Sequence, residues 1–100
     1  MDELGELVER SGRGDEAAFG ELVRRTERLV AGVVGRLLGD VHEAEEVVQE
    51  IYVDAYRILP RWEPGARFTT WLHRAATRAA LERRRARGRY ERRIEEVRAG

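Results

Sequence analysis

The sequence predicts an all-α protein, a compact bundle of about four helices. Apolar residues recur at intervals of three and four along most of the chain, which is the spacing of one face of an α-helix. Only two prolines interrupt this pattern, Pro60 and Pro64, and they lie close together. No stretch alternates between apolar and polar residues as a half-buried strand does. A chain of 100 residues fits a single domain with one modest core.

Local start and stop signals mark the first two helices. A short helix is expected near residues 2–12, and the stretch SGRGD ends it. Asp15 is the predicted N-cap of a second helix, because its side-chain oxygen can accept from a backbone amide of the first turn. Gly39 can end that helix in a left-handed conformation. The apolar residues of the second helix are Phe19, Leu22, Val23, Val30, Val33, Leu37 and Leu38.

A third helix is predicted between Gly39 and Pro60. Asp40 and Glu43 match the D-x-x-E pattern of a capping box, in which two side chains satisfy the first backbone amides reciprocally. Pro60 stops the helix, because the residue before a proline disfavours helical geometry. The apolar stripe of this helix is Val41, Ala44, Val47, Val48, Ile51, Ala55 and Ile58.

The stretch PRWEPGA is a loop of about seven residues, and a last long helix starts near Arg67. This helix is expected to fray beyond Gly88, because the tail RYERRIEEVRAG is polar with only a weak helical period. The predicted organisation is therefore a helical domain of residues 1–87, followed by a loosely ordered tail or linker start at 88–100. The inward stripe of the last helix is Phe68, Trp71, Leu72, Ala75 and Ala79.

Charge divides the chain into two halves, although its formal net charge is zero. Residues 1–56 carry fourteen acidic residues and six arginines, a net of −8, whereas residues 57–100 carry thirteen arginines and five glutamates, a net of +8. Such asymmetry predicts that two surfaces meet two different partners. All nineteen basic residues are arginine, which suits contacts to phosphates and bases better than lysine does.

Several classes of function are excluded or disfavoured by composition. The chain has no cysteine, so it has neither disulfides nor thiolate metal sites, and His42 and His73 are too few and too far apart to suggest zinc. The acidic start MDELGELVER lacks the apolar run of a signal peptide, and no apolar stretch approaches membrane-spanning length. A cytoplasmic protein with no cofactor and no membrane partner is expected.

The outer face of the third helix is the first candidate site. Its acidic stripe consists of Glu43, Glu46, Glu50 and Asp54. Gln49 lies beside the stripe. Arg57 is the only nearby basic residue of the same helix that could neutralise part of the stripe's negative charge. Like charges four residues apart destabilise an isolated helix by roughly 0.2–0.5 kcal/mol. The stripe is therefore either a tolerated, solvated helix face or a docking surface for a basic partner.

The loop RWEPGARF is the second candidate site. Trp62 lies between Arg61 and Arg67, and Pro64 with Gly65 gives a tight turn. Trp62 either caps the core in a helix–helix connection or helps to form a rigid pocket, lined by arginine, for one extruded base.

The start of the last helix is the third candidate site. An arginine-rich helix beside aromatic residues is typical of nucleic-acid binders. Phe68 and Trp71 are either pure core or part of such a surface, and the pattern does not separate DNA from RNA. Hydroxyl, imidazole and guanidinium donors, which contact phosphates and base edges, are Thr70, His73, Arg74, Thr77 and Arg78. The positive field continues through Arg83, Arg84, Arg85, Arg87 and Arg89.

Three pieces, EAEEVVQEIYVDAYR, LPRW and FTTWLHRAATRAALERRR, resemble in their order and spacing region 2 of bacterial RNA polymerase sigma factors of the extracytoplasmic-function group. The stretch GDEAAFGELVRR is similar to the start of the same region, so the resemblance covers roughly residues 10–87. Each piece alone is a weak signal, and the ordered set is specific. The resemblance implies the compact helical fold of sigma region 2.

The resemblance also implies two main partners. The acidic helix would dock on the coiled-coil clamp helices of the β′ subunit of core RNA polymerase, through Glu46, Gln49, Glu50 and Asp54, with Glu43 at the start of the stripe. The last helix and the preceding loop would recognise and melt the promoter −10 element, with the non-template strand along the arginine face and a flipped base in the loop. The predicted DNA-binding residues are Arg61, Trp62, Arg67, Thr69, Thr70, Trp71, His73, Arg74, Thr77, Arg78 and Arg85. An anti-sigma factor is a further expected partner. No catalytic residue is required, because the polymerase performs the phosphoryl transfer.

Two departures from the family pattern leave questions open. Family members often carry asparagine at the position of Arg78 and leucine near Arg84, so the base preference at Arg78 is open. A full sigma factor of this group also has a second helical domain that reads the −35 element, so the chain is either an excised domain or a protein with only the first half. Two alternative functions remain: a sigma-like module that binds polymerase or an anti-sigma factor without productive DNA recognition, and a general arginine-rich nucleic-acid binder whose acidic half only confers solubility.

Overall fold

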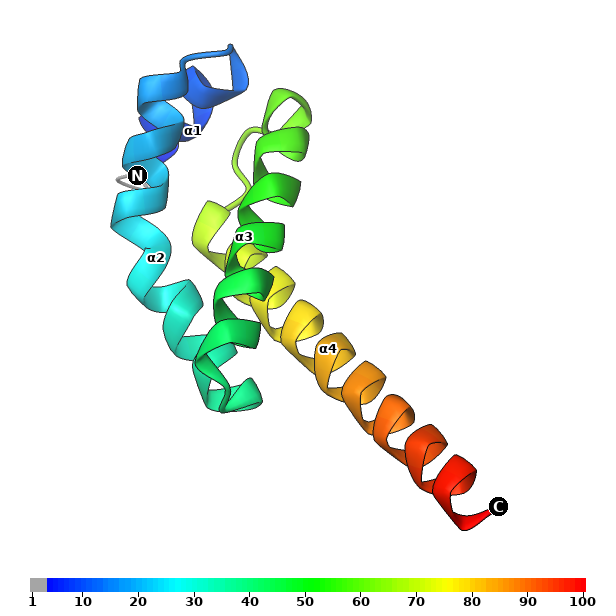
Figure 1. Ribbon diagram of the computed structural model, residues 1–100. Helices are drawn as coiled ribbons and strands as arrows, with labels where there is room; N and C mark the ends of the chain where they lie inside the picture. The colour runs from blue at the N-terminus through cyan, green and yellow to red at the C-terminus, as the bar shows by residue number, and fades with distance from the viewer. Residues whose placement is uncertain (1–3) are drawn as a thin grey trace.

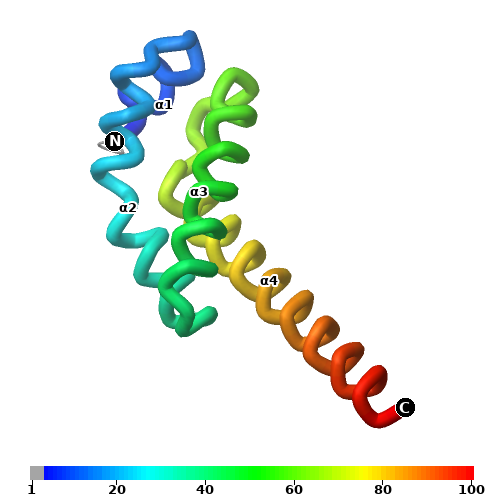
Figure 2. The backbone as a smooth tube through the Cα atoms, viewed as in Figure 1, coloured from blue at the N-terminus to red at the C-terminus, as the bar shows by residue number. Residues whose placement is uncertain are grey.

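A computed structural model describes residues 4–100, and within this range the chain forms helices and no strand. The elements in order are α1 (Gly5–Gly12), α2 (Glu16–Leu38), α3 (Val41–Ile58), the short 3-10 helix η1 (Leu59–Arg61) and α4 (Phe68–Ala99). The predicted all-α bundle of about four helices is thereby confirmed. Residues 2 and 3 of the expected first helix lie outside the described part. Figures 1 and 2 show α2 and α3 running in opposite directions, with α4 starting beside them and pointing away at its C-terminal end.

The predicted caps fix the helix boundaries. Asp15 accepts a hydrogen bond from the Ala18 amide at 3.1 Å, and Asp40 accepts one from the Glu43 amide at 3.0 Å. Gly39 ends α2 with a φ of 72°, a left-handed conformation that glycine adopts without steric cost. The capping box is only half present, because the Glu43 carboxylate accepts from Arg87 Nη1 at 2.6 Å instead of returning to Asp40. Short-range side-chain chemistry therefore sets where α2 and α3 begin.

One hydrophobic core joins all four helices, and α4 packs against both α2 and α3. Ala76 and Ala80 of α4 are fully buried, and their small side chains leave room for the neighbouring helices. Full burial of a large apolar side chain stabilises a fold by about 1.5–3 kcal/mol. The largest fully buried side chains are Phe68, Leu22, Ile51, Leu72, Val30, Val34 and Val47.

The predicted apolar stripes are corrected at a few positions. The apolar spacing predicts that Val41 faces inward, but it is 70% exposed because it is the first residue of α3 and lies at the rim of the bundle. On α4 the buried row continues from Leu72 to Ala76 and Ala80, so Trp71 and the predicted alanines at 75 and 79 are only half-buried. Because a helix has 3.6 residues per turn, two adjacent rows of α4 side chains could face the core. The packing of α4 against α2 and α3 covers the row of Leu72 more completely than the row of Trp71.

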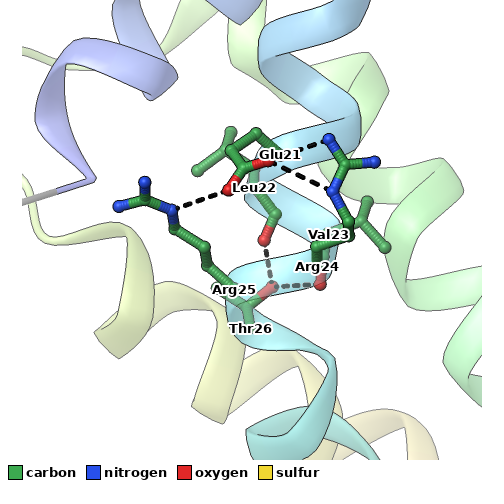
Figure 3. A network of polar contacts seen from close by, with 6 residues as sticks. All are labelled: Glu21, Leu22, Val23, Arg24, Arg25 and Thr26. Carbon is green, nitrogen blue, oxygen red and sulfur yellow. Dashed lines mark hydrogen bonds and ion pairs between the residues drawn. The ribbon is translucent and has the colours of Figure 1, made fainter.

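A pair of hydroxyl groups is buried between α2 and α3. Thr26 Oγ1 donates to the Leu22 carbonyl at 2.7 Å and lies 2.7 Å from the Tyr52 hydroxyl, which is then placed to donate to it. Figure 3 shows this turn of α2, with Glu21 on its outer side accepting from Arg24 and Arg25. Burial raises the pKa of Tyr52 above its ordinary 10.0. The pair fixes the register of α2 against α3, because sliding one helix along the other would leave the buried hydroxyl groups without hydrogen-bond partners.

The last helix is longer than the sequence predicts. It continues through Gly88 without a break to Ala99, so the expectation of a loosely ordered tail is wrong for the secondary structure of residues 88–99. Tyr90 and Val97 are 66% and 74% exposed, so this part has little tertiary packing. Arginine, glutamate and alanine are strong helix formers, and a single glycine costs only about 1 kcal/mol in a helix. Local propensity therefore outweighs Gly88.

The first helix braces the connection that leads to α4. Gly12 lies so close to η1 that a Cβ at this position would be 2.7 Å from the Leu59 carbonyl oxygen. That atom belongs to the backbone and cannot move aside as a flexible side chain can. Helix α1 also lines, with residues of the 62–67 loop, a hollow on one side of that loop. The position of α1 therefore helps to set the position of the loop.

Gly12→Ala should lower the free energy of unfolding by about 1–3 kcal/mol relative to Gly5→Ala, because the added methyl group overpacks the contact with η1. Gly5 is the matched control, since it lies on the same helix and a Cβ there meets nothing within 4 Å. Urea unfolding followed by circular dichroism measures both variants. Equal stabilities would contradict the close approach of α1 to η1.

Asp40→Asn should reduce the acid sensitivity of the fold. The hydrogen bond from the Glu43 backbone amide holds the pKa of the Asp40 carboxyl below its ordinary 3.8. The charged cap therefore stabilises the fold at pH values above the ordinary pKa, and this stabilisation is lost as pH falls through the lower pKa of the folded state. Asparagine caps a helix equally well but does not titrate. The drop in melting temperature between about pH 6 and about pH 3 should therefore be smaller for the variant than for the wild type. Equal drops would contradict a role for the Asp40 charge.

Candidate protein and nucleic-acid interfaces

Neither a membrane-spanning helix nor a metal-binding cluster is found among the described residues. None of the helices in the range 4–100 combines the length and apolar character needed to cross a membrane. The same range contains no group of three or more His, Asp or Glu side chains placed to hold a metal ion. The candidate sites are surfaces of α3, α4 and the loop between them, because the predicted residues lie there.

The acidic stripe lies on the solvent side of α3. Glu43 at its start is half-buried. The rest of the stripe is exposed, namely Glu46, Glu50 and Asp54, and so is Gln49 beside it. These four exposed side chains surround a shallow cleft together with Val53 and Arg57. Val53 is 49% exposed, so the cleft offers an apolar contact among its charges. The arrangement can bind a partner that presents basic groups around an apolar centre.

The ion-pair partners of the stripe come from α4. Arg83 Nη1 lies 2.9 Å from Glu46 Oε2, and Arg83 Nη2 lies 3.0 Å from Glu50 Oε1. Both contacts raise the pKa of Arg83 above its ordinary value, mainly through the hydrogen bond to Glu46. The sequence suggests that Arg57 neutralises part of the stripe's negative charge. In the described part of the chain, however, Arg57 makes no ion pair with the stripe. Part of the stripe's charge is thus neutralised within the molecule.

The predicted nucleic-acid residues lie along two clefts that share Arg74. One cleft is lined by the loop and the first turns of α4, and its members include Arg61, Trp62, Arg67, Thr70, Trp71 and Arg74. The other follows the outer side of α4 and is lined by His73, Arg74, Thr77, Arg78, Leu81 and Arg85. Thr69 is half-buried and lies outside both clefts. The structure therefore brings ten of the eleven predicted residues together.

An aromatic cluster braces the loop cleft from inside. The Trp62 ring lies edge-on to Phe68 and to Trp71, with ring centroids 5.6 and 6.3 Å apart. Trp62 Nε1 also donates to the Ala66 carbonyl at 3.3 Å, which closes the loop on itself. Gly65 at a φ of 91° permits the turn. Trp62 therefore supports the core and lines the cleft at once.

The structure separates the core residues of this region from those that can bind. Phe68 is 1% exposed and belongs to the core, whereas Trp71 is half-buried and lines the loop cleft. The Thr77 hydroxyl donates to the His73 carbonyl of its own helix at 3.0 Å, so its donor is already used. Five predicted arginines make no ion pair within residues 4–100 and are free for an anionic partner: Arg61, Arg67, Arg74, Arg78 and Arg85.

Two features of these surfaces were not identified from the sequence. Val53 lies seven residues after Glu46 and three after Glu50. Residues at these spacings share one face of a helix, so the sequence was sufficient to place Val53 beside the stripe. The contact of Arg83 with the same glutamates depends on how α4 packs on α3. No local pattern carries that information.

Comparison with known proteins gives a consistent family. A family model described as Sigma-70 region 2 matches residues 22–90, so the match starts later than the predicted residue 10 and ends slightly beyond 87. The RNA polymerase sigma-H factor of Pseudomonas aeruginosa is 40% identical over 84 residues, which are 84% of this chain and 44% of that protein. The ECF RNA polymerase sigma-E factor of Escherichia coli is 43% identical over 76 residues, covering 74% of this chain and 38% of that protein. The chain spans less than half the length of these curated relatives.

A solved structure agrees with these relatives. An engineered region 2 of sigmaE, determined by NMR in complex with GTAAAA, superposes with a TM-score of 0.79 at 38% identity. The alignment covers 90% of this chain and 97% of that one, so nearly the whole neighbouring domain is matched. With the family match spanning both candidate surfaces, the chain belongs to the sigma-70 region 2 family, in its extracytoplasmic-function group.

Proposed function

We propose that this chain is a promoter-recognition domain that docks on core RNA polymerase through α3 and recognises and melts the promoter −10 element through α4 and its preceding loop. The observation that carries the proposal is the separation of charge on one small domain. Carboxylates of α3 are exposed on one face, and arginines without ion-pair partners in the described range follow the loop and the outer side of α4. The sigmaE neighbour, which was solved with GTAAAA, supports the DNA side.

The polymerase side of the proposal rests on the acidic stripe and Gln49. The proposed contact is the coiled-coil clamp helices of the β′ subunit, which would supply basic groups to Glu46, Glu50 and Asp54. Val53 would lie at the centre of this contact and lose its exposed apolar surface on binding. An anti-sigma factor is a second proposed partner, and one that covered the same stripe would exclude the polymerase.

The DNA side of the proposal assigns the non-template strand to the arginine face of α4. Opening duplex DNA costs about 1–2 kcal/mol per base step. Stacking of a base on an aromatic side chain returns about 1–3 kcal/mol, and arginine–phosphate contacts add a salt-dependent term. The cleft between the loop and α4 is the proposed place for one flipped base, beside Arg67 and the accessible part of Trp71. The domain needs only binding energy for this task, so we propose an initiation factor and not an enzyme.

We propose that the region 2 domain ends at residue 87. Arg87 makes the last ion pair between α4 and α3, with Glu43. Residues 88–99 continue the helix beyond it, and we propose that they begin the connection to whatever follows in a longer sigma factor.

Glu46→Gln with Glu50→Gln should weaken binding to core polymerase at least about tenfold, which corresponds to about 1.4 kcal/mol. The fold should persist, because exposed ion pairs contribute little to stability. Affinity measured with fluorescently labelled protein tests this expectation. Glu91→Gln with Glu95→Gln is the control, since these two exposed glutamates are also four residues apart, lie on α4 away from the stripe, and give the same charge change. Equal affinities of the two double variants would remove the docking role of the stripe.

Arg74→Gln and Arg78→Gln should each weaken binding to a single-stranded −10 oligonucleotide and make it less salt-dependent. Each lost phosphate contact should reduce the slope of log affinity against log salt by about 0.7. Arg28→Gln on α2, beside the groove between α2 and α3, is the control. Anisotropy titrations at several salt concentrations give the slopes. Unchanged slopes, together with intact polymerase binding, would favour the sigma-like module that does not use DNA.

A further inference from the structure

Arg83 of α4 bridges two glutamates of the acidic stripe. One nitrogen of its guanidinium group contacts Glu46 at 2.9 Å, and the other contacts Glu50 at 3.0 Å. The Arg83 side chain is 25% exposed, whereas those of Glu46 and Glu50 remain 65% and 62% exposed. The arginine is therefore much less accessible than the two carboxylates, which still face solvent.

The bridge leaves each carboxylate able to bind a second partner. An ionised carboxylate has two oxygens that accept hydrogen bonds, and Arg83 uses Oε2 of Glu46 and Oε1 of Glu50. Within residues 4–100 the remaining oxygen of each group has no ion-pair or hydrogen-bond partner, so it is available to a cation from outside. Without Arg83, two like charges four residues apart would repel each other and their flexible side chains would separate.

A second arginine holds the start of the stripe in the same way. Arg87 contacts Glu43 at 2.6 Å, and its other terminal nitrogen is 3.4 Å from the Leu38 carbonyl at the end of α2. The connection between α2 and α3 is thus tied to α4. Two successive inward arginines of α4 fix three of the four acidic residues of the stripe.

We propose that Arg83 is a positioning residue of the polymerase-binding surface, which preorganises Glu46 and Glu50 so that their free oxygens meet basic groups of the polymerase. This inference rests on the proposed function and deepens it. A side chain that is already ordered loses less conformational entropy on binding, so the complex dissociates more slowly. Arg83 thereby connects the docking surface to α4, the helix assigned to DNA.

The effect of removing Arg83 distinguishes positioning from simple charge. If only net charge mattered, loss of this arginine would make the α3 face more negative and strengthen binding to a basic partner. The same gain is expected if Arg83 competes with the polymerase for the glutamates. Positioning predicts the opposite sign, a lower affinity caused mainly by faster dissociation.

The test compares Arg83→Gln with Arg84→Gln in the full chain. Arg84 is the exposed neighbour on the same helix, makes no ion pair within residues 4–100, and gives the same change of charge. Association and dissociation rates with immobilised core polymerase should show an affinity about three- to tenfold lower for Arg83→Gln, and wild-type dissociation for Arg84→Gln. Equal or tighter binding by Arg83→Gln would overturn the proposal.

A double-mutant cycle shows whether Arg83 acts through the two glutamates. In a chain that already carries Glu46→Gln and Glu50→Gln, Arg83→Gln should have no further effect on dissociation. A loss as large as in the wild-type background would mean a general structural role and would overturn the proposal. If Arg83→Gln does not fold, Arg83→Lys replaces it. A single ammonium group is expected to bridge the glutamates less well, and full wild-type affinity of that variant would count against the bridge.

The two levels of inference fail in different ways. Wild-type polymerase affinity of the Glu46→Gln, Glu50→Gln protein alone would reject the proposed docking function. Weakened binding by that protein combined with undiminished binding by Arg83→Gln would reject only the positioning role.

Discussion

The packing of α4 against α2 and α3 determines where both candidate surfaces lie. Phe68, Leu72, Ala76 and Ala80 form the buried row of α4, and together with the helical repeat they fix the direction of every other side chain on it. The row that contains Arg74 then faces solvent. An error of one position in this packing would rotate the whole surface by about 100°, so the apolar contact specifies the polar function.

The same packing moderates the division of charge along the chain. The sequence halves differ by sixteen charges, but α4 returns part of its positive charge to α3 through Arg83 and Arg87. What remains exposed is a set of carboxylates on α3 and a set of arginines on the outer side of α4 and its loop. Such separation orients a charged partner before contact, because the acidic face repels DNA that approaches from the wrong side. Under the proposed function, this separation keeps the surface for each partner clear of the other.

The features that sequence predicts well are those decided within one or two turns of helix. Asp15 and Asp40 cap their helices as expected, because the acceptor and the amide it satisfies are three residues apart. Most of the proposed DNA residues lie together because they belong to one helix face and the adjoining loop. The inward row of α4, the partners of the acidic stripe and the burial of Tyr52 depend on contacts between helices, which periodicity alone does not determine. The tail beyond Gly88 is an example of a local feature for which the sequence-based prediction is wrong. Its apolar residues have only a weak helical period, but its arginines, glutamates and alanines favour a helix by their intrinsic propensity.

The central claim is that one small domain holds polymerase on α3 and −10 DNA on α4 at the same time. The most direct measurement is the binding of a fluorescent single strand to core polymerase in the presence and absence of this chain. We predict that the chain creates a complex that binds the −10 sequence in preference to a scrambled strand of the same length and composition. The claim would be contradicted if the chain and core polymerase bind the scrambled strand as tightly, or if the chain adds nothing to the binding of either strand.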